Sequence, residues 1–216
     1  MAETDVTEDT YIASKDLPIT FKVKYLGSEH AKGLWGIKHT RRPVDHLVSE
    51  INGHHFVQKI PTKFYFHQVT IAKNLPPNKI LPLCNLTVAL DGVIIETAHK
   101  SGNKSWKYAI DTISYGVQDL VYTRVFAMII VKENYNLRDE NPFEVHAFVC
   151  DSRALARKLT YALAASFQEY SKRVKEEEQL AKDSGQPIER SRKKFAIDLR
   201  SPEEIKQELD EQETEA

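Results

Sequence analysis

The sequence has few of the residues that crosslink small secreted domains, with only Cys84 and Cys150 among 216 residues. Because these two cysteines lie far apart, a disulfide framework is not expected, and a reducing cytoplasmic environment is favoured. No stretch approaches the roughly 20 apolar residues of a membrane-spanning helix. The acidic start also lacks the basic and apolar blocks of a secretion signal. The formal net charge of -1 excludes a histone-like mode of nucleic-acid binding.

Charge is unevenly distributed along the chain. Lysine and arginine predominate between residues 22 and 79, whereas acidic residues predominate before residue 10 and after residue 201. This asymmetry favours a basic face that meets an anionic partner, although it is also compatible with simple solubility. Residues 1–15 are therefore expected to be an acidic tail. Residues 183–216 are expected to be a polar, partly disordered tail in which residues 202–210 could form a short helix.

The hydrophobic pattern predicts mainly strands followed by one long helix. Residues 19–26 alternate between apolar and polar, which is typical of a half-buried strand, and a short helix is predicted over 40–51 with Pro43 in its first turn. A hairpin is predicted over 86–97 because Asp91-Gly92, which suits a type I′ turn, separates two β-rich runs. Three further strands are predicted over 107–116, 124–132 and 143–150.

The last predicted element is a helix of about 30 residues that begins after Asp151 or Ser152, either of which can cap it. Its apolar residues recur at helical spacing. Together the elements predict an α+β fold of about seven antiparallel strands capped by the C-terminal helix, with a short helix after the first strand. Residues 54–82, interrupted by prolines, are interpreted as an insertion.

Five segments follow one another along residues 16–178 and carry distinctive motifs. They are Phe21-Lys22-Val23-Lys24-Tyr25-Leu26-Gly27-Ser28, Ile110-Asp111-Thr112-Ile113-Ser114-Tyr115-Gly116, Arg124-Val125-Phe126-Ala127-Met128-Ile129, Val145-His146-Ala147-Phe148-Val149-Cys150 and Leu163-Ala164-Ala165-Ser166-Phe167-Gln168-Glu169-Tyr170. In this order they resemble the phosphotyrosine-binding (PTB, or phosphotyrosine-interaction) domain family. Gly116 departs from the family pattern, which commonly has Cys or Ile there. The resemblance implies a PTB/PH-like antiparallel sandwich over residues 16–182.

The family's fold leaves one edge strand open beside the C-terminal helix, where a peptide can add as a further strand. The resemblance implies that this groove binds NPxY-type peptides of receptor tails, phosphorylated or not, and that Phe167 packs a hydrophobic residue of the peptide. The alternative interpretation, favoured for Leu163, is that these helix residues belong to the core. The residues expected at the peptide are Asp111, Thr112, Ile113, Ser114, Tyr115, Gly116, Val117, Leu163, Phe167 and Tyr170.

The predicted function is therefore a non-enzymatic cytoplasmic adaptor that links receptor tails to endocytic or signalling machinery. Two alternatives stay open: a PH-like module that binds phosphoinositides at a membrane surface, and a scaffold without peptide binding. Neither a cofactor nor a metal site is predicted, because no nucleophile elbow, phosphate loop, H-E-x-x-H or C-x-x-C motif is present. The residues expected at an anionic headgroup are Lys22, Lys24, Lys38, His39, Arg41 and Arg42.

Overall fold

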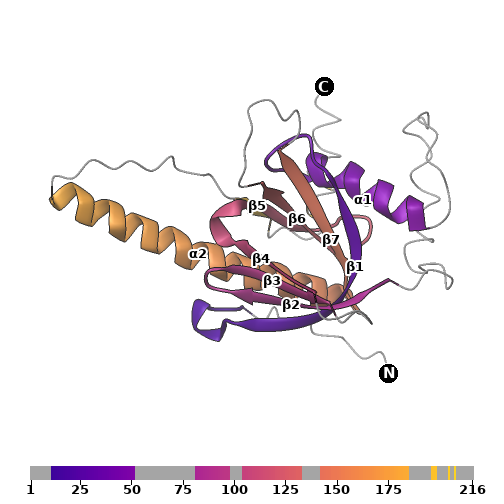
Figure 1. The fold of residues 1–216 in the computed structure, drawn as a ribbon, viewed down its shortest axis with the longest axis horizontal. Helices are drawn as coiled ribbons and strands as arrows, with labels where there is room; N and C mark the ends of the chain where they lie inside the picture. Colours follow the sequence, from indigo (N-terminus) through magenta and orange to yellow (C-terminus); the bar gives the residue numbers. More distant parts are fainter. Residues whose placement is uncertain are drawn as a thin grey trace.

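The computed structural model describes residues 11–51, 81–97, 104–132, 142–184 and 196–198, together with residues 204 and 207. Figure 1 shows these elements as a curved sheet with a long helix against it. In chain order the elements are the 3-10 helix η1 (Ser14–Asp16), β1 (Ile19–His30), α1 (Ile37–Ile51), β2 (Leu83–Ala89), β3 (Gly92–Thr97), β4 (Lys104–Ala109), the 3-10 helix η3 (Ile110–Thr112), β5 (Ile113–Gln118), β6 (Val125–Val131), β7 (Phe143–Val149), α2 (Arg153–Asp183) and β8 (Ala196–Asp198).

The described strands form one sheet in the order β4-β3-β2-β1-β7-β6-β5-β8. The first seven strands of this order pair antiparallel, and the short helix α1 follows β1. The predicted α+β fold class is therefore confirmed. β8 is an addition to it, since it pairs with β5 in parallel.

The long strand β1 serves both halves of the sheet. Its first part, from Ile19 to Lys24, pairs with β2, and its second part, from Lys24 to His30, pairs with β7. The register shifts between Tyr25 and Gly27, and Gly27 has φ +142. A Cβ atom at Gly27 would lie 2.8 Å from Leu47 Cδ2, so glycine at this bulge lets α1 pack close to the strand.

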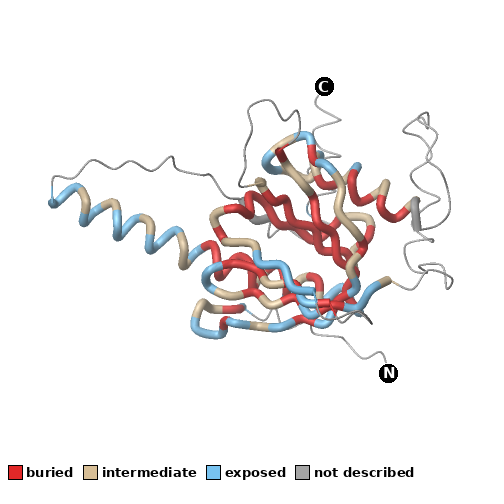
Figure 2. Tube along the Cα trace, in the orientation of Figure 1, coloured by how far each residue is buried: buried red, intermediate tan, exposed pale blue. Residues whose placement is uncertain are grey.

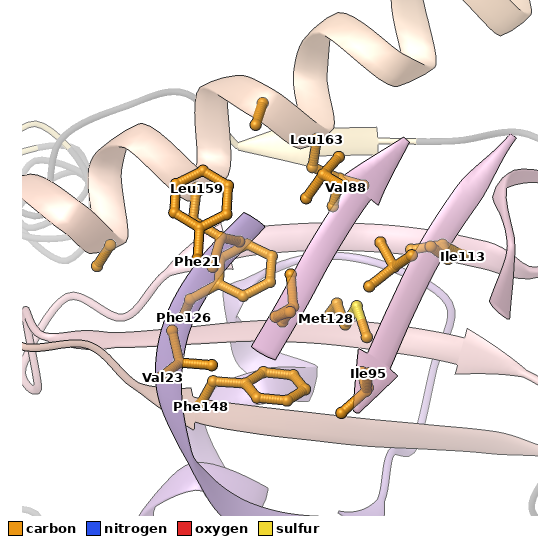
Figure 3. Packing of buried hydrophobic residues seen from close by; sticks show 14 of the residues in the cluster. Phe21, Val23, Val88, Ile95, Ile113, Phe126, Met128, Phe148, Leu159 and Leu163 are labelled. Carbon is orange, nitrogen blue, oxygen red and sulfur yellow. The ribbon is translucent and has the colours of Figure 1, made fainter. Parts of the chain in front are cut away.

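Two apolar clusters cover the two faces of the β5–β6–β7 half, and Figure 2 shows how completely these strands are buried. The larger cluster lies between the two halves of the sheet and α2, where Phe21, Phe126, Phe148 and Leu159 contribute (Figure 3). The second cluster lies under α1, whose Val44, Leu47 and Val48 it includes. The final part of α2 leaves the sheet and is mostly exposed (Figures 1 and 2).

Three local predictions differ from the structure. Helix α1 begins at Ile37, after Gly36 with φ +97, so Pro43 lies inside the helix rather than in its first turn. The hairpin loop consists of Leu90 and Asp91, with Ala89 paired to Gly92. Among the described residues positive φ values occur only at glycines, and Gly92 has φ +145, so the predicted type I′ turn is wrong.

The predicted strand over 107–116 is also wrong in its extent, because the 3-10 helix η3 divides it into β4 and β5. Outside the described residues lie most of the predicted insertion 54–82 and most of the predicted helix 202–210. At the other end, Ile12 is 5% exposed and belongs to the larger apolar cluster, so the packed domain includes residues before 16. No helix in the described ranges is long and apolar enough to span a bilayer.

Candidate peptide-binding edge

Strand β5 carries five of the ten residues that the sequence assigned to peptide binding, and a bulge at Ser114 decides which way they face. Ile113 pairs with Ile130, whereas Tyr115 already pairs with Ile129, so Ser114 is the extra residue. Ile113 consequently packs in the cluster beneath α2, while Tyr115 packs in the cluster beneath α1. Ile113 and Tyr115, both expected at the peptide, therefore face opposite sides of the sheet.

Hydrogen bonds hold this bulge in place. The Ser114 hydroxyl donates to the carbonyl oxygen of Leu34 at 2.7 Å and lies 3.4 Å from that of Ile129. Leu34 belongs to the loop between β1 and α1, so a single side chain joins that loop to β5. Asp111 and Thr112, also predicted to contact the peptide, lie in η3 and therefore do not extend the strand. The Thr112 hydroxyl donates to the carbonyl of Ala109 within that turn.

The far end of β5 is fixed by Asp119, whose side chain is almost fully buried. Its Oδ1 accepts the backbone N–H groups of Val121 and Tyr122, each at 2.8 Å, and the Arg41 Nη1 at 2.8 Å. Arg41 also pairs with Asp45 on its own helix and lies over the Tyr122 ring, 4.9 Å from its centroid. This network joins α1 to the turn that follows β5.

The charge states within this network follow from burial and pairing. Burial by itself lowers the pKa of Arg41, but the carboxylates of Asp119 and Asp45 outweigh it and raise the pKa above its usual value. Burial raises the pKa of Asp45, and Arg41 opposes that shift. Burial also raises the pKa of Tyr122 to about 12. At neutral pH the guanidinium is therefore charged and the phenol is protonated.

The edge of β5 is not open, which corrects the expectation on which the predicted groove depends. One side of β5 pairs with β6, and on the other side Tyr115, Gly116 and Val117 pair with Ala196, Ile197 and Asp198 of β8. Strand β8 also contacts α2, and Figure 3 shows it in pale yellow beside that helix. A segment from the chain's own C-terminal region thus lies where a bound peptide was expected.

The three predicted contact residues of α2 differ in burial. Leu163 has no exposed surface and belongs to the core, as the alternative interpretation predicted. Phe167 is 6% exposed and packs in the same cluster, and its contact with a peptide stays a prediction. Tyr170 is half-buried at the border of that cluster, with the Arg173 guanidinium 5.8 Å from its ring centroid. Of the three, Tyr170 has the most surface to offer a ligand.

The tip of the β2–β3 hairpin is attached to the same stretch of α2. The buried Ser166 hydroxyl donates to the carbonyl of Ala89 at 2.8 Å, and Arg173 Nη2 donates to the carbonyl of Leu90 at 3.3 Å. The helix is begun by Ser152, whose Oγ accepts the N–H of Leu155 at 3.0 Å, so one of the two predicted caps is confirmed. These contacts fix the position of α2 relative to both halves of the sheet.

The residues predicted to bind an anionic headgroup are divided between two elements. Lys22 and Lys24 are exposed on β1, and Lys38 and Arg42 are exposed on α1. Arg41 instead points into the network with Asp45 and Asp119, so its charge is already balanced by carboxylates. This position corrects its placement in an exposed basic patch.

His39, the sixth residue of that set, lies against Gly33, where a Cβ atom would be 2.5 Å from its Nε2. Burial and, to a smaller degree, Lys38 lower the pKa of His39. The imidazole is therefore mostly neutral at pH 7 and adds little positive charge there. Binding of a phosphoinositide by the exposed lysines and Arg42 stays a prediction.

One buried histidine lies outside the predicted sites. The Nδ1 of His146 on β7 is 3.0 Å from the Tyr25 hydroxyl, and its Nε2 is 3.4 Å from the Tyr108 hydroxyl. Burial lowers the pKa of His146, and Glu144, whose Oε2 lies 3.9 Å from Nε2, acts in the opposite direction. Burial disfavours the charged form of Tyr108 as well, and in a phenol this raises the pKa, to about 12. The cluster thus joins β1, β4 and β7 through neutral groups.

The two cysteines are free and buried, as expected of small apolar side chains. Burial raises the pKa of Cys84 to about 11 and that of Cys150 to about 12, so neither is a thiolate at neutral pH. Within the described ranges no group of three or more His, Cys, Asp or Glu side chains could hold a metal ion.

Sequence reasoning missed the roles of Asp119 and Ser166 and did not place residues 196–198 against β5. Asp119 follows a strand and precedes a turn, a position where Asp often accepts backbone N–H groups, so this part of its role was open to prediction. Its pairing with Arg41, 78 positions away, was not. For β8, the apolar residues within a polar tail were the available signal, but their strand partner is set by the tertiary fold.

No family model and no curated protein matches the chain. Among solved structures, the chain is similar to the solution structure of the C-terminal phosphotyrosine interaction domain of APBB2 from mouse, with 19% sequence identity and a TM-score of 0.44. The match covers 69% of this chain and 85% of that domain. At this similarity, any conclusion about function must come from the chain's own geometry.

Proposed function

We propose that the protein is a non-enzymatic cytoplasmic adaptor whose β5 edge, beside α2, binds an extended NPxY-type peptide of a receptor tail as an added strand. The observation that supports this proposal is the pairing of β5 with β8, because it means that this edge has room for a further strand. Backbone hydrogen bonds supply roughly 0.5–1.5 kcal/mol each to such binding and are indifferent to sequence. Selectivity must then come from side chains at the border of the strand and the helix.

A bound peptide has to replace β8, and two features favour such an exchange. Strand β8 pairs with three of the six residues of β5. Its pairing is also parallel, which is slightly less stable per residue than antiparallel pairing. A longer antiparallel peptide could therefore use more of the strand.

The experiment measures fluorescence anisotropy of a labelled NPxY peptide, plain and tyrosine-phosphorylated, titrated with the full chain. We expect micromolar binding that disappears when the Asn-Pro pair of the peptide is replaced by Ala-Ala. The adaptor proposal fails if neither peptide binds the wild-type chain or the variants described below in which β8 is disrupted.

A matched pair of tyrosine variants tests whether α2 forms one wall of the site. Tyr161 and Tyr170 are both half-buried against the larger cluster, and each lies near an arginine. Nine positions along a helix place them on roughly opposite sides of α2. We expect Tyr170→Ala to weaken peptide binding about tenfold, equivalent to about 1.4 kcal/mol. Tyr161→Ala should lower thermal stability similarly and leave binding unchanged, whereas equal effects on binding would contradict the site.

A further inference from the structure

Strand β8 comes from the chain's own C-terminal region and occupies the edge that the proposed function assigns to a partner. Ala196 pairs with Tyr115, Ile197 with Gly116 and Asp198 with Val117. Gly116 is the central residue of this pairing, and it is also where the sequence departs from the resembling family. Tyr115, Gly116 and Val117 are all buried.

Occupation by β8 and binding of another strand exclude each other along these three residues. Each strand of a sheet has two edges for backbone hydrogen bonds, and β6 already takes one edge of β5. The other edge accepts one strand at a time, whether that strand runs parallel or antiparallel. A peptide from outside can therefore pair with Tyr115–Val117 only while β8 is away.

The length of the intervening chain is compatible with β8 belonging to the same molecule. Helix α2 ends at Asp183, and the distance back along it to Leu163, near which Figure 3 shows β8, is about 30 Å at 1.5 Å per residue. The chain from Ser184 to Ala196 spans at most about 40 Å. The connection is therefore long enough for β8 to come from the same molecule, and a strand tethered over this length competes at a high effective concentration.

From these observations we infer that residues 196–198 are an intramolecular ligand of β5 that closes the peptide-binding edge until a partner displaces them. The inference rests on the proposed function in that both use the same edge. A partner that binds only the open state is weakened by the fraction of molecules that are open. If nine molecules in ten are closed, release of β8 should raise the apparent affinity of the partner about tenfold.

Proline substitutions in the full chain test this inference, because proline has no N–H to donate to a neighbouring strand. Alternate residues of a strand direct their N–H groups to the same neighbour, so the N–H groups that face β5 belong either to Ile197 or to Ala196 and Asp198. Ile197→Pro removes the first, and the double variant Ala196→Pro/Asp198→Pro removes the second. Gln212→Pro places the same residue elsewhere in the C-terminal region and is the control. The described members of the two apolar clusters lie between Ile12 and Phe167. The melting temperature of each variant shows whether it keeps the fold before its exchange and binding are compared with wild type.

The first measurement is amide hydrogen exchange over Tyr115–Val117, which needs no ligand. We expect exchange to be at least tenfold faster in one or both β8 variants than in the wild-type chain and in Gln212→Pro. If exchange over this segment is the same in all four proteins, β8 does not protect the edge and the inference is wrong.

The second measurement uses a labelled peptide of residues 193–205, added to the full-length proteins. We expect saturable binding to the β8 variant with the faster exchange, and binding at least tenfold weaker to the wild-type chain, whose edge is filled. Equal binding to the wild-type chain and to both β8 variants would overturn the inference. An NPxY peptide should compete with this labelled peptide and should bind the same β8 variant about tenfold more tightly than wild type.

The two measurements also separate failure of the inference from failure of the proposed function. If the 193–205 peptide binds a β8 variant and NPxY peptides bind neither the wild-type chain nor any variant, the intramolecular ligand is supported and the proposed NPxY partner is wrong. If NPxY peptides bind wild type and both β8 variants equally, with unchanged exchange, the adaptor function stands and closure by β8 is overturned.

Discussion

Replacement of Asp119 by alanine should destabilise the protein more than any surface substitution. The Asp119 side chain is 1% exposed, and its Oδ1 accepts three hydrogen bonds at 2.8 Å, from Arg41 Nη1 and from the N–H groups of Val121 and Tyr122. Asp119→Ala leaves two backbone donors without this acceptor and leaves Arg41 with Asp45 as its remaining carboxylate partner. Removal of one partner of a buried ion pair typically costs about 3–5 kcal/mol, and we expect a loss in this range.

A double-mutant cycle with Arg41→Met separates the ion pair from the backbone contacts. Arg41→Met alone leaves the buried Asp119 carboxylate without its cation, so it should also cost about 3 kcal/mol. The double variant Asp119→Ala/Arg41→Met removes both charges of this ion pair, so neither charge stays buried without the other. The double variant should therefore be more stable than the sum of the single losses predicts, by roughly 1.5–3 kcal/mol.

The assay is urea unfolding at pH 7 followed by far-ultraviolet circular dichroism. Lys172→Ala is the control, because it breaks an exposed i,i+4 contact with Glu176 at 3.9 Å and should cost less than about 0.5 kcal/mol. An Asp119→Ala loss below about 1 kcal/mol, or single losses that add within about 0.5 kcal/mol, would refute this account of the turn after β5.

Three further predictions concern other parts of the molecule. Gly92→Ala should destabilise by about 1–3 kcal/mol in thermal unfolding, because φ is +145 and the new Cβ would lie 2.0 Å from the Tyr108 carbonyl oxygen; a neutral result would contradict this packing. Burial lowers the pKa of His146, so the unfolded chain takes up a proton below about pH 6.5 that the folded chain resists. Its contribution to stability is present above that pH and is lost on acidification at up to about 1.4 kcal/mol per pH unit, and His146→Gln should remove this slope. Cys84 and Cys150, with pKa values of about 11 and about 12, should resist iodoacetamide at pH 7.5 and react after unfolding; rapid modification of the folded chain would contradict their burial.

Most of the fold could be predicted because its signals are local. The alternation in β1, the apolar runs of β6 and β7 and the capped, periodic α2 each follow from spacing along the chain. The candidate site was predicted less well, since period-two alternation places Ile113 and Tyr115 on one face. The bulge at Ser114 separates them, and it depends on a hydroxyl bonded to Leu34, 80 positions earlier.

By itself the sequence determined most of the strands, the long helix α2 with its start at Ser152, and the apolar character of the two cysteines, because each depends on neighbouring residues. Tertiary structure alone decided three things: the glycine bulge of β1 against Leu47, the pairing of Arg41 with Asp119, and the filling of the β5 edge by residues 196–198. Each of these joins segments that are distant in the chain. Backbone donors and buried charges must find partners, but which partner they meet depends on how the whole chain packs.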